Sequence, residues 1–399
     1  MNTSLLVCKE LLKIQVGLDD LKNDVSSNET LRQLDILKAQ ATCHIEAFTS
    51  QFLPFIEFVR FLLHYGTSVI VAIGVVLNAV SFVVLLQKNM RRSASSLFLS
   101  VLAIYDSLAL LLNFMIGVIR GQNPGANQNF MDSQFLCKFH GVLVEVFNLL
   151  SVWTIVAFTI ERFIIVKFPL KAKLFTTVKT LLIIGCVSMA VLIFSCHKIF
   201  VTGFEGDSVF GYKGCQTDRA RIPGIVYFYV AFNTWLPTII IMTFNIAIIR
   251  AIKIHQAKRE TMTTTTSRTD AKATRLLLTV SFAYLLLVFP LGVIQTIELF
   301  WNAKVNSSVV TDPDYVDNRI VKIKLKWVRA FFFFFYQINF AVNFFLYVFS
   351  SSGARFRYNL RRLFGLKAQP LLNETMVEPS RNAVVPAENT SLPASQTET

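Results

Sequence analysis

Charged residues are scarce in this sequence. Only 16% of its 399 residues are Asp, Glu, Lys or Arg, compared with about 25% in an average soluble domain. Hydrophobic residues make up 53% of the chain, which contains 37 Phe, and the mean hydropathy is +0.52. This composition excludes an ordinary set of soluble domains and favours a membrane protein.

Motifs for metal binding and catalysis are also missing. The six cysteines form no CxxC pair and no Cys/His cluster, which argues against a structural zinc site. The sequence shows no phosphate-binding loop and no Ser/His/Asp constellation. We therefore expect neither an enzyme nor a tightly bound organic cofactor.

The net charge of +14 does not indicate a nucleic-acid-binding protein. Most of the cations lie between long apolar runs, where they orient a protein in a membrane. A nucleic-acid-binding domain would instead gather them on one soluble face. We expect a lipid bilayer as the surrounding medium and no nucleic-acid partner.

Seven apolar runs are each long enough to cross the hydrocarbon core of a bilayer, which is about 30 Å thick. They cover approximately residues 61–87, 94–119, 135–162, 176–199, 223–250, 272–300 and 327–350. None alternates apolar and polar residues as a barrel strand does, so helices are the only spanning solution. The predicted fold class is an all-α membrane protein, a seven-transmembrane helix bundle.

The regions outside the runs complete the predicted organisation. Residues 1–60 form an extracellular N-terminal segment whose leucine spacing predicts short amphipathic helices. The bundle occupies residues 61–350. In residues 351–367, arginines interleave with apolar residues, which predicts a short eighth, amphipathic helix on the membrane surface. Residues 368–399 are polar and predict a disordered cytoplasmic tail.

The distribution of cations predicts the orientation. Lys and Arg follow the first, third and fifth runs, whereas acids outnumber bases in residues 1–60. By the positive-inside rule the N-terminus is extracellular, and we expect a multi-pass protein of the plasma membrane. One loop on the predicted outer side disagrees with the rule, because it carries Arg319, Lys322, Lys324, Lys326 and Arg329.

Four cysteines lie on the predicted outer side. Cys137 begins the third helix and Cys215 lies in the loop after the fourth, so a disulfide between them would hold that loop over the bundle. The alternative is two independent thiols. Cys8 and Cys43 could pair or remain apart. The predicted outer glycosylation sites are Asn2, Asn28 and Asn306.

Asp106 lies in the middle of the second span, where a carboxylate is costly and functional by default. Ser151, Asn339 and Asn343 are its candidate neighbours. Together these groups offer hard oxygen ligands suited to an allosteric sodium ion. The alternative is a hydrogen-bonded cluster that only holds the helices together.

Arg162 lies at the inner end of the third helix, about 37 Å from Cys137 at 1.5 Å per residue. Glu161 is its neighbour, and Asp270 precedes the sixth helix within possible reach. A contact that joins the third and sixth helices and can be broken is the kind of bistable element that switches use. The alternative is ordinary snorkelling of an arginine beside a membrane.

Taken together, these residues resemble the rhodopsin-like (class A) G-protein-coupled receptors over about residues 60–366. The matching segments are Gly74–Asn78 (GVVLN), Leu102–Asp106 (LAIYD), the spacing from Cys137 to Arg162, and Asn343–Tyr347 (NFFLY, with Phe for the usual Pro). The resemblance implies a receptor that activates a heterotrimeric G protein, with arrestin and a receptor kinase as further partners. It also implies that Asn343 and Tyr347 take part in the activation switch with Glu161, Arg162 and Asp270.

The sequence also departs from the family pattern. Val288 stands where the sixth helix usually has a tryptophan, Asn245 replaces a usual tyrosine, and the fourth helix has no tryptophan. These departures leave the activation mechanism open. They resemble invertebrate neuropeptide receptors of the FMRFamide-receptor-like kind.

The resemblance also narrows the ligand class. Val144 stands where amine receptors have an aspartate, and Gln337 stands where opsins have the Schiff-base lysine. An extracellular peptide is therefore expected, with Glu145 and Glu298 as acceptors for a cationic group; the alternative is that they only line the bundle. The expected ligand-binding residues are His140, Glu145, Asn148, Gln295, Glu298 and Trp301.

Two other function classes remain open from the sequence. A receptor of the same fold could bind a small non-peptide or chemosensory ligand. A transporter or channel would call for inverted repeats or several charges within the spans, and only Asp106 and Glu145 lie deep within them.

Overall fold

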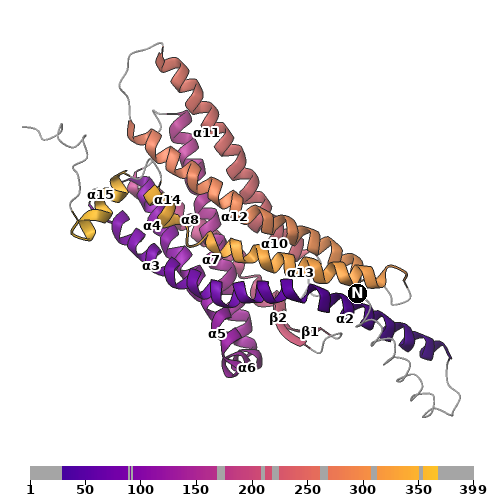
Figure 1. Ribbon diagram of the computed structural model, residues 1–399. Coiled ribbons are helices and arrows are strands. Elements are labelled where there is room, and N and C mark those ends of the chain that lie inside the picture. The colour runs from indigo at the N-terminus through magenta and orange to yellow at the C-terminus, as the bar shows by residue number, and fades with distance from the viewer. Residues whose placement is uncertain are drawn as a thin grey trace, which may run out of the picture.

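The computed structural model describes residues 29–88, 90, 93–168, 176–207, 212–217, 224–260, 268–306, 312–349 and 354–366. Within this part the chain is helical apart from one two-stranded hairpin. The helices gather into an elongated bundle, from which α2 (Glu29–Phe61) extends at one end (Figure 1). We call this end, predicted to be extracellular, the outer end.

The first five spans in the chain are built mainly from apolar helices. Their bounds are α3 (Thr67–Leu85), α4 (Ala94–Ala109) with α5 (Ile116–Gln122), α7 (Gln134–Lys167), α8 (Thr177–Ser195), and α10 (Ile225–Val230) with α11 (Leu236–Glu260). Short π-helical turns join α4 to α5 at Leu110–Met115 and α10 to α11 at Ala231–Trp235. The second and fifth spans are therefore each one continuous helix that contains a π-helical turn.

The remaining helices complete the bundle. They are α12 (Arg268–Asn306), α13 (Tyr315–Ile338), α14 (Asn343–Phe349) and α15 (Ala354–Leu363). In the described part of the chain, six helices are long and apolar enough to cross a membrane. The pair α13 and α14, bent by 52°, supplies a seventh if it is one span. The prediction of a seven-helix membrane bundle is confirmed.

The first span begins much earlier than the sequence predicts. Over residues 29–61, where short amphipathic helices were expected, the single helix α2 runs through a π-helical turn at Leu62–Gly66 directly into α3. The reason is tertiary, because α2 packs along α13. Pro54 lies inside α2 without ending it.

The seventh span also begins earlier than expected. Residues 319–329, predicted to be an outer loop, belong to α13, which starts at Tyr315. Lys and Arg are good helix formers. Helix α13 packs against α2 and makes its most extensive contacts with α12.

A hairpin that the sequence does not predict lies at the outer end. Strand β1 (Thr202–Asp207) pairs antiparallel with β2 (Tyr212–Thr217), and Phe204 lies opposite Cys215. Strand β1 contacts α7, and the short helix α9 (Lys198–Val201) leads into it from α8. A second short helix, α6 (Pro124–Asp132), connects α5 to α7.

The predicted amphipathic eighth helix is present as α15, at the opposite end of the bundle from α2 (Figure 1). Phe356 is buried and its ring packs on Tyr347 with centroids 5.4 Å apart. Arg357 Nη1 donates to the Val348 carbonyl over 2.7 Å. Helix α15 is therefore fixed to α14 by both apolar and polar contacts.

The core lies between the helices, and the outward faces are apolar too. Buried side chains such as Leu110, Tyr284 and Phe340 fill the centre. On the outside, Leu182 and Ile193 of α8 and Phe282 of α12 are each about two-thirds exposed, at 66%, 68% and 68%. Helices that are apolar all round are expected of membrane spans, whose outer faces contact lipid.

Candidate functional site

The polar centre of the bundle is built around Asp106 of α4, which is fully buried. Ser151 of α7 donates its hydroxyl to Asp106 Oδ1 over 2.6 Å. Asn343 of α14 donates its amide to Asp106 Oδ2, also over 2.6 Å. One carboxylate therefore joins three helices, and these are the partners that the sequence suggests.

This arrangement leaves oxygen atoms that suit a small cation. Asn343 uses its amide nitrogen toward Asp106, so its amide oxygen remains free for another contact. Asn339 is 5% exposed and lies in the same break of the seventh span. Carboxylate, hydroxyl and amide oxygens fit the chemistry of sodium, so the residues present fit the predicted ion. Whether an ion binds here stays a prediction.

A break in the seventh span lies beside this centre. Between α13 and α14, the amides of Asn339, Phe340 and Ala341 bond to the carbonyls three residues earlier, which tightens the turn. The Phe340 carbonyl accepts a hydrogen bond from Asn78 Nδ2 over 2.9 Å. The helix bends here without a proline, because a buried side chain of α3 satisfies a backbone group that the break exposes.

The inner end of α7 carries a buried ion pair. Glu161 is 2% exposed and Arg162 4%. Arg162 Nε lies 2.7 Å from Glu161 Oε2, and Arg162 Nη2 donates to Oε1 over 3.1 Å. Because the pair is buried, losing either partner is costly. The guanidinium also lies 5.4 Å from the centre of the Phe158 ring.

Of two further residues of the predicted switch, Tyr347 and Asp270, the structure describes only the side chain of Tyr347. Tyr347 of α14 is 1% exposed and lies in the inner core cluster with Phe158 and Leu277. The side chain of Asp270 lies outside the described residues. Its contact with Arg162 therefore stays a prediction.

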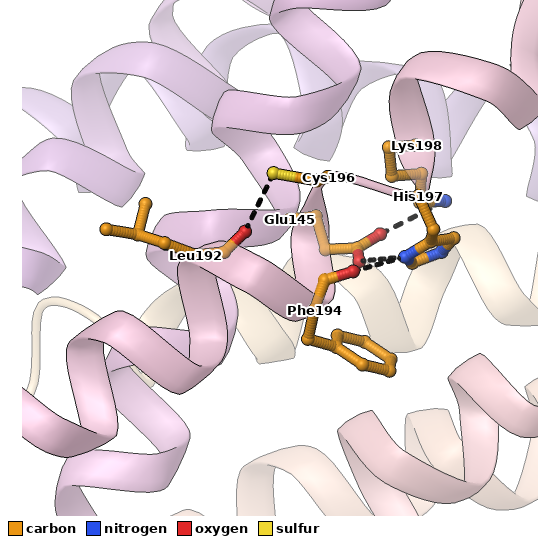
Figure 2. Close-up of polar contacts among 6 residues, drawn as sticks. All are labelled: Glu145, Leu192, Phe194, Cys196, His197 and Lys198. Carbon is orange, nitrogen blue, oxygen red and sulfur yellow. Dashed lines mark hydrogen bonds and ion pairs between the residues drawn. The ribbon is translucent and has the colours of Figure 1, made fainter.

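The outer end contains a second buried carboxylate, Glu145 of α7, which is 1% exposed. Lys198 Nζ lies 3.3 Å from Glu145 Oε2, and His197 Nδ1 lies 3.6 Å from Oε1 (Figure 2). His197 Nδ1 also lies 2.6 Å from the Phe194 carbonyl. Both side chains come from the segment that follows α8, so Glu145 holds that segment against α7.

The second predicted acceptor, Glu298 of α12, also has a cationic neighbour. Arg329 Nε of α13 lies 2.6 Å from Glu298 Oε2. Near it, Trp301 Nε1 donates to the Asn318 carbonyl over 3.1 Å. The structure thus brings Glu298 and Trp301 to the contact between α12 and α13. Each predicted acceptor carboxylate already has a cation from the protein itself.

The other predicted ligand-binding residues lie on α7 and α12. His140 Nε2 is 3.1 Å from the Leu112 carbonyl, and its ring meets that of Phe130 edge-on. Asn148 is buried at 7% exposure, one turn below Glu145 on α7. Gln295 of α12 is half-buried. A role for these residues in binding a ligand stays a prediction.

The described cysteines divide into two kinds. Cys43 and Cys137 are each disulfide-bonded, whereas Cys186 and Cys196 carry free thiols. Cys8 and the Cys215 side chain lie outside the described residues, so both predicted pairings stay predictions. The predicted glycosylation sites Asn2 and Asn28, and the side chain of Asn306, lie outside them as well.

Sequence reasoning missed the partners of the outer carboxylates and one contact between the fifth and sixth spans. His197 and Lys198 lie at the end of the fourth predicted run, and Arg329 lies in a segment taken for a loop, so no spacing rule links them to the acids. Trp235 Nε1 donates to Thr296 Oγ1 over 2.9 Å. Trp235 lies two residues before Pro237, and no sequence signal links it to Thr296.

Comparison with known proteins agrees with this geometry. Residues 78–347 match the family described as 7 transmembrane receptor (rhodopsin family). The chain is also similar to a "Rhodopsin, GQ-coupled" of Mizuhopecten yessoensis, with 26% identity over 231 residues. That alignment covers 56% of this chain and 45% of the relative, so the match spans less than half of the relative's length.

Proposed function

Because this chain belongs to the rhodopsin family of seven-transmembrane receptors, we propose that it binds an extracellular peptide and activates a heterotrimeric G protein. The chain is a multi-pass membrane protein of a non-enzymatic family. The proposal places it in the plasma membrane, with the α2 end outside. Arrestin and a receptor kinase are proposed as further partners at the inner end.

The observation that carries the proposal is the buried Glu161–Arg162 pair at the inner end of α7. Separating the charges of a buried ion pair costs free energy, because each charge then lacks its partner. Such a contact can therefore hold a protein in one of two conformations until a ligand favours the other. A ligand that favours the state in which Arg162 is released would expose a cation at the inner end. Asp106 bonds to side chains of α7 and α14, so a movement of one of these helices would be passed to the others through its carboxylate.

A peptide is favoured over an amine or a retinal-type ligand. Val144 supplies no carboxylate for an amine, and Gln337, which is 1% exposed, has an amide that forms no Schiff base. The relative's name includes rhodopsin, so a light receptor is the second candidate. The likeness to invertebrate neuropeptide receptors makes a short neuropeptide the first class to test.

The direct test is to express the full chain in cells and screen a library of short neuropeptides. Calcium release is the first readout, because the similar rhodopsin is named as Gq-coupled, and a cAMP readout covers other G proteins. A peptide that activates the cells only when the chain is present supports the proposal. Activation by a small non-peptide, a light-dependent response, or ion flux independent of G protein would each overturn it.

The proposal includes a structural role for the outer cysteines and sequons. Cys137 is proposed to pair with Cys215, and Cys8 with Cys43, with glycans at Asn2, Asn28 and Asn306. Replacing Cys215 by Ser should abolish ligand binding at the cell surface and leave Cys137 open to thiol reagents. Binding that persists in this variant would contradict the first pairing.

A further inference from the structure

The carboxylate of Glu145 is enclosed at the outer end of the bundle but is loosely bonded there (Figure 2). Neither of its oxygens accepts a well-aligned hydrogen bond from the part of the chain that the structure describes. Lys198 Nζ lies 3.3 Å from one oxygen and His197 Nδ1 lies 3.6 Å from the other. Charge-assisted N–H···O bonds measure about 2.7–2.9 Å. The carboxylate can therefore accept a closer donor than either neighbour offers.

His197 does not supply that donor. Its Nδ1 lies 2.6 Å from the Phe194 carbonyl. A carbonyl oxygen can only accept, so the hydrogen on Nδ1 is directed at Phe194 rather than at Glu145. The ring centroids of His197 and Phe194 lie 5.1 Å apart, which keeps the imidazole in this orientation. The charge that pairs with Glu145 is therefore the Lys198 ammonium.

The Lys198 ammonium occupies a site with two walls. One wall is the Glu145 carboxylate of α7, and the other is the Tyr229 ring of α10, whose centre lies 4.5 Å from Lys198 Nζ. A carboxylate beside an aromatic face is suited to an organic cation, through charge pairing and the cation–π interaction. We call this place the cation site. Its walls belong to the spans, whereas its occupant comes from the segment after α8.

The segment that carries Lys198 is short and lies at the surface. Helix α9 has four residues, and the backbone amides of Ile199 and Phe200 bond to carbonyls only three residues earlier. Ile199 and Phe200 are 45% and 67% exposed, whereas the Lys198 side chain is 12% exposed. Lys198 thus points inward from an otherwise exposed turn. Withdrawing this side chain would open the cation site without disturbing the packing of the spans.

An exchange of cations would cost Glu145 little. A buried carboxylate needs a positive partner, but that partner can come from a ligand as well as from the chain. A guanidinium is less strongly hydrated than the Lys198 ammonium and can bond to both carboxylate oxygens at once. Glu298, by contrast, already has a guanidinium, with Arg329 Nε 2.6 Å from its Oε2. A basic ligand therefore gains more at Glu145.

We infer that Lys198 is a built-in competitor of the ligand, which fills the cation site until a basic side chain of the peptide displaces it. This inference rests on the proposed peptide-receptor function and names the regulation of its binding site. Part of the ligand's binding free energy is spent on displacing Lys198, so the competitor lowers the affinity for every ligand that enters the cation site. It also selects for ligands whose cation pairs with Glu145 better than a lysine does.

The test uses the full chain in nanodiscs of neutral phosphatidylcholine and decapeptides selected on it from a phage-displayed random library. Selected peptides should be enriched in Arg over the unselected library. Lys198→Met should lower the Kd of such a peptide about tenfold, because the competitor is gone. Lys198→Arg should raise the Kd about tenfold, since it keeps the ion pair and fills the site better. Lys326→Met, at an exposed position of α13, is the matched control and should leave the Kd unchanged.

Two further measurements separate competition from a purely structural role. An analogue of the selected peptide with Gln in place of its Arg should bind weakly, and its Kd should change less than twofold between Lys198→Met and Lys198→Arg. A structural effect of position 198 would shift the Kd of both peptides alike. Acetylation of the Lys198 amine, followed by mass spectrometry, should become faster when the basic peptide is bound and should not change with the Gln analogue.

Selection of peptides without basic residues, equal shifts of Kd for the two peptides, or no faster acetylation of Lys198 would each overturn the inference. The outcome for the proposed function is read separately, from G-protein activation by the selected peptides. Peptides that activate the G protein without displacing Lys198 would leave the proposed function standing and remove the competitor. Basic peptides that displace Lys198 but activate no G protein would support the competitor and count against the proposed function. Failure to select any peptide would overturn both.

Discussion

Glu145 of α7 and Lys198 of α9 form an ion pair inside the outer end of the bundle, with 3.3 Å between Lys198 Nζ and Glu145 Oε2. The two side chains are 1% and 12% exposed. A carboxylate so enclosed depends on its partner, because water cannot replace the lost contact. This pair, together with His197, fixes the segment between α8 and the β1–β2 hairpin against α7 (Figure 2).

Replacing Glu145 by Gln should therefore destabilise the protein. Lys198 would lose its counter-charge inside the bundle, and removing one partner of a buried pair costs about 3–5 kcal/mol. Thermal unfolding of the purified chain in detergent measures the change. We expect a lower midpoint for Glu145→Gln and also for Lys198→Met.

The double variant tests whether the two residues act as a pair. Combining Glu145→Gln with Lys198→Met removes both charges, so the combined loss should be smaller than the sum of the single losses by at least about 1 kcal/mol. Additive losses would show that the two side chains act independently.

The response to sodium should depend on Asp106. If the oxygens around this carboxylate hold a sodium ion, NaCl should raise the unfolding midpoint above that in choline chloride at equal ionic strength, because ligand binding stabilises the folded state. Asp106→Asn should abolish this difference. Ser100→Ala is a suitable control, since Ser100 is also buried on α4 but bonds only to the Ser96 carbonyl among the described contacts. A sodium response that survives in Asp106→Asn would exclude the site.

Glu161 should restrain the receptor in its inactive state. Glu161→Gln removes the charge that holds Arg162, so the rate of nucleotide exchange on a reconstituted G protein without ligand should rise several-fold, as a loss of about 1 kcal/mol in the bias between two states implies. Glu57→Gln, an exposed acid on α2, is the control and should leave this rate unchanged. A fall in thermal stability with no change in basal exchange would limit the pair to a structural role.

The sequence was sufficient for the number of spans and for the approximate place of most of them, because membrane thickness sets their minimum length. The third run, expected at about 135–162, is α7 at Gln134–Lys167, and the eighth helix expected within 351–367 is α15 at Ala354–Leu363. The contacts of Asp106 with Ser151 and Asn343 could also be anticipated. A carboxylate in the middle of a membrane needs polar neighbours, and few are available at that depth.

The parts that could not be predicted depend on packing between distant segments. Helix α2 and the outer half of α13 look like a polar tail and a basic loop when read separately. They form continuous helices because each covers the other, as the Arg60–Trp327 contact shows. The bend between α13 and α14 likewise could not be predicted from a proline, because the sequence has none there. It depends on Asn78, which lies far away in the sequence.

Helix α12 lies very close to the fifth span at Gly292, and this close approach predicts the effect of a substitution there. A Cβ atom placed on Gly292 would overlap Thr234 Cγ2 of the fifth span. Thr234 is buried at 4% exposure, and the neighbouring Trp235–Thr296 hydrogen bond holds the same two spans together. Gly292→Ala should therefore lower stability by about 1–3 kcal/mol through overpacking, despite the better helix propensity of alanine.

The double variant Gly292→Ala with Thr234→Ser makes this prediction specific. Serine keeps the hydroxyl of Thr234 and lacks the methyl group that the new Cβ would meet, so thermal unfolding should return most of the way to that of the unchanged chain. Gly185→Ala is the matched control, because nothing lies within 4 Å of a Cβ at that exposed position of α8. It should be neutral or stabilising by up to about 1 kcal/mol. If Gly292→Ala behaves like Gly185→Ala, or if Thr234→Ser fails to restore stability, the close approach of the fifth and sixth spans at Gly292 is not what requires glycine there.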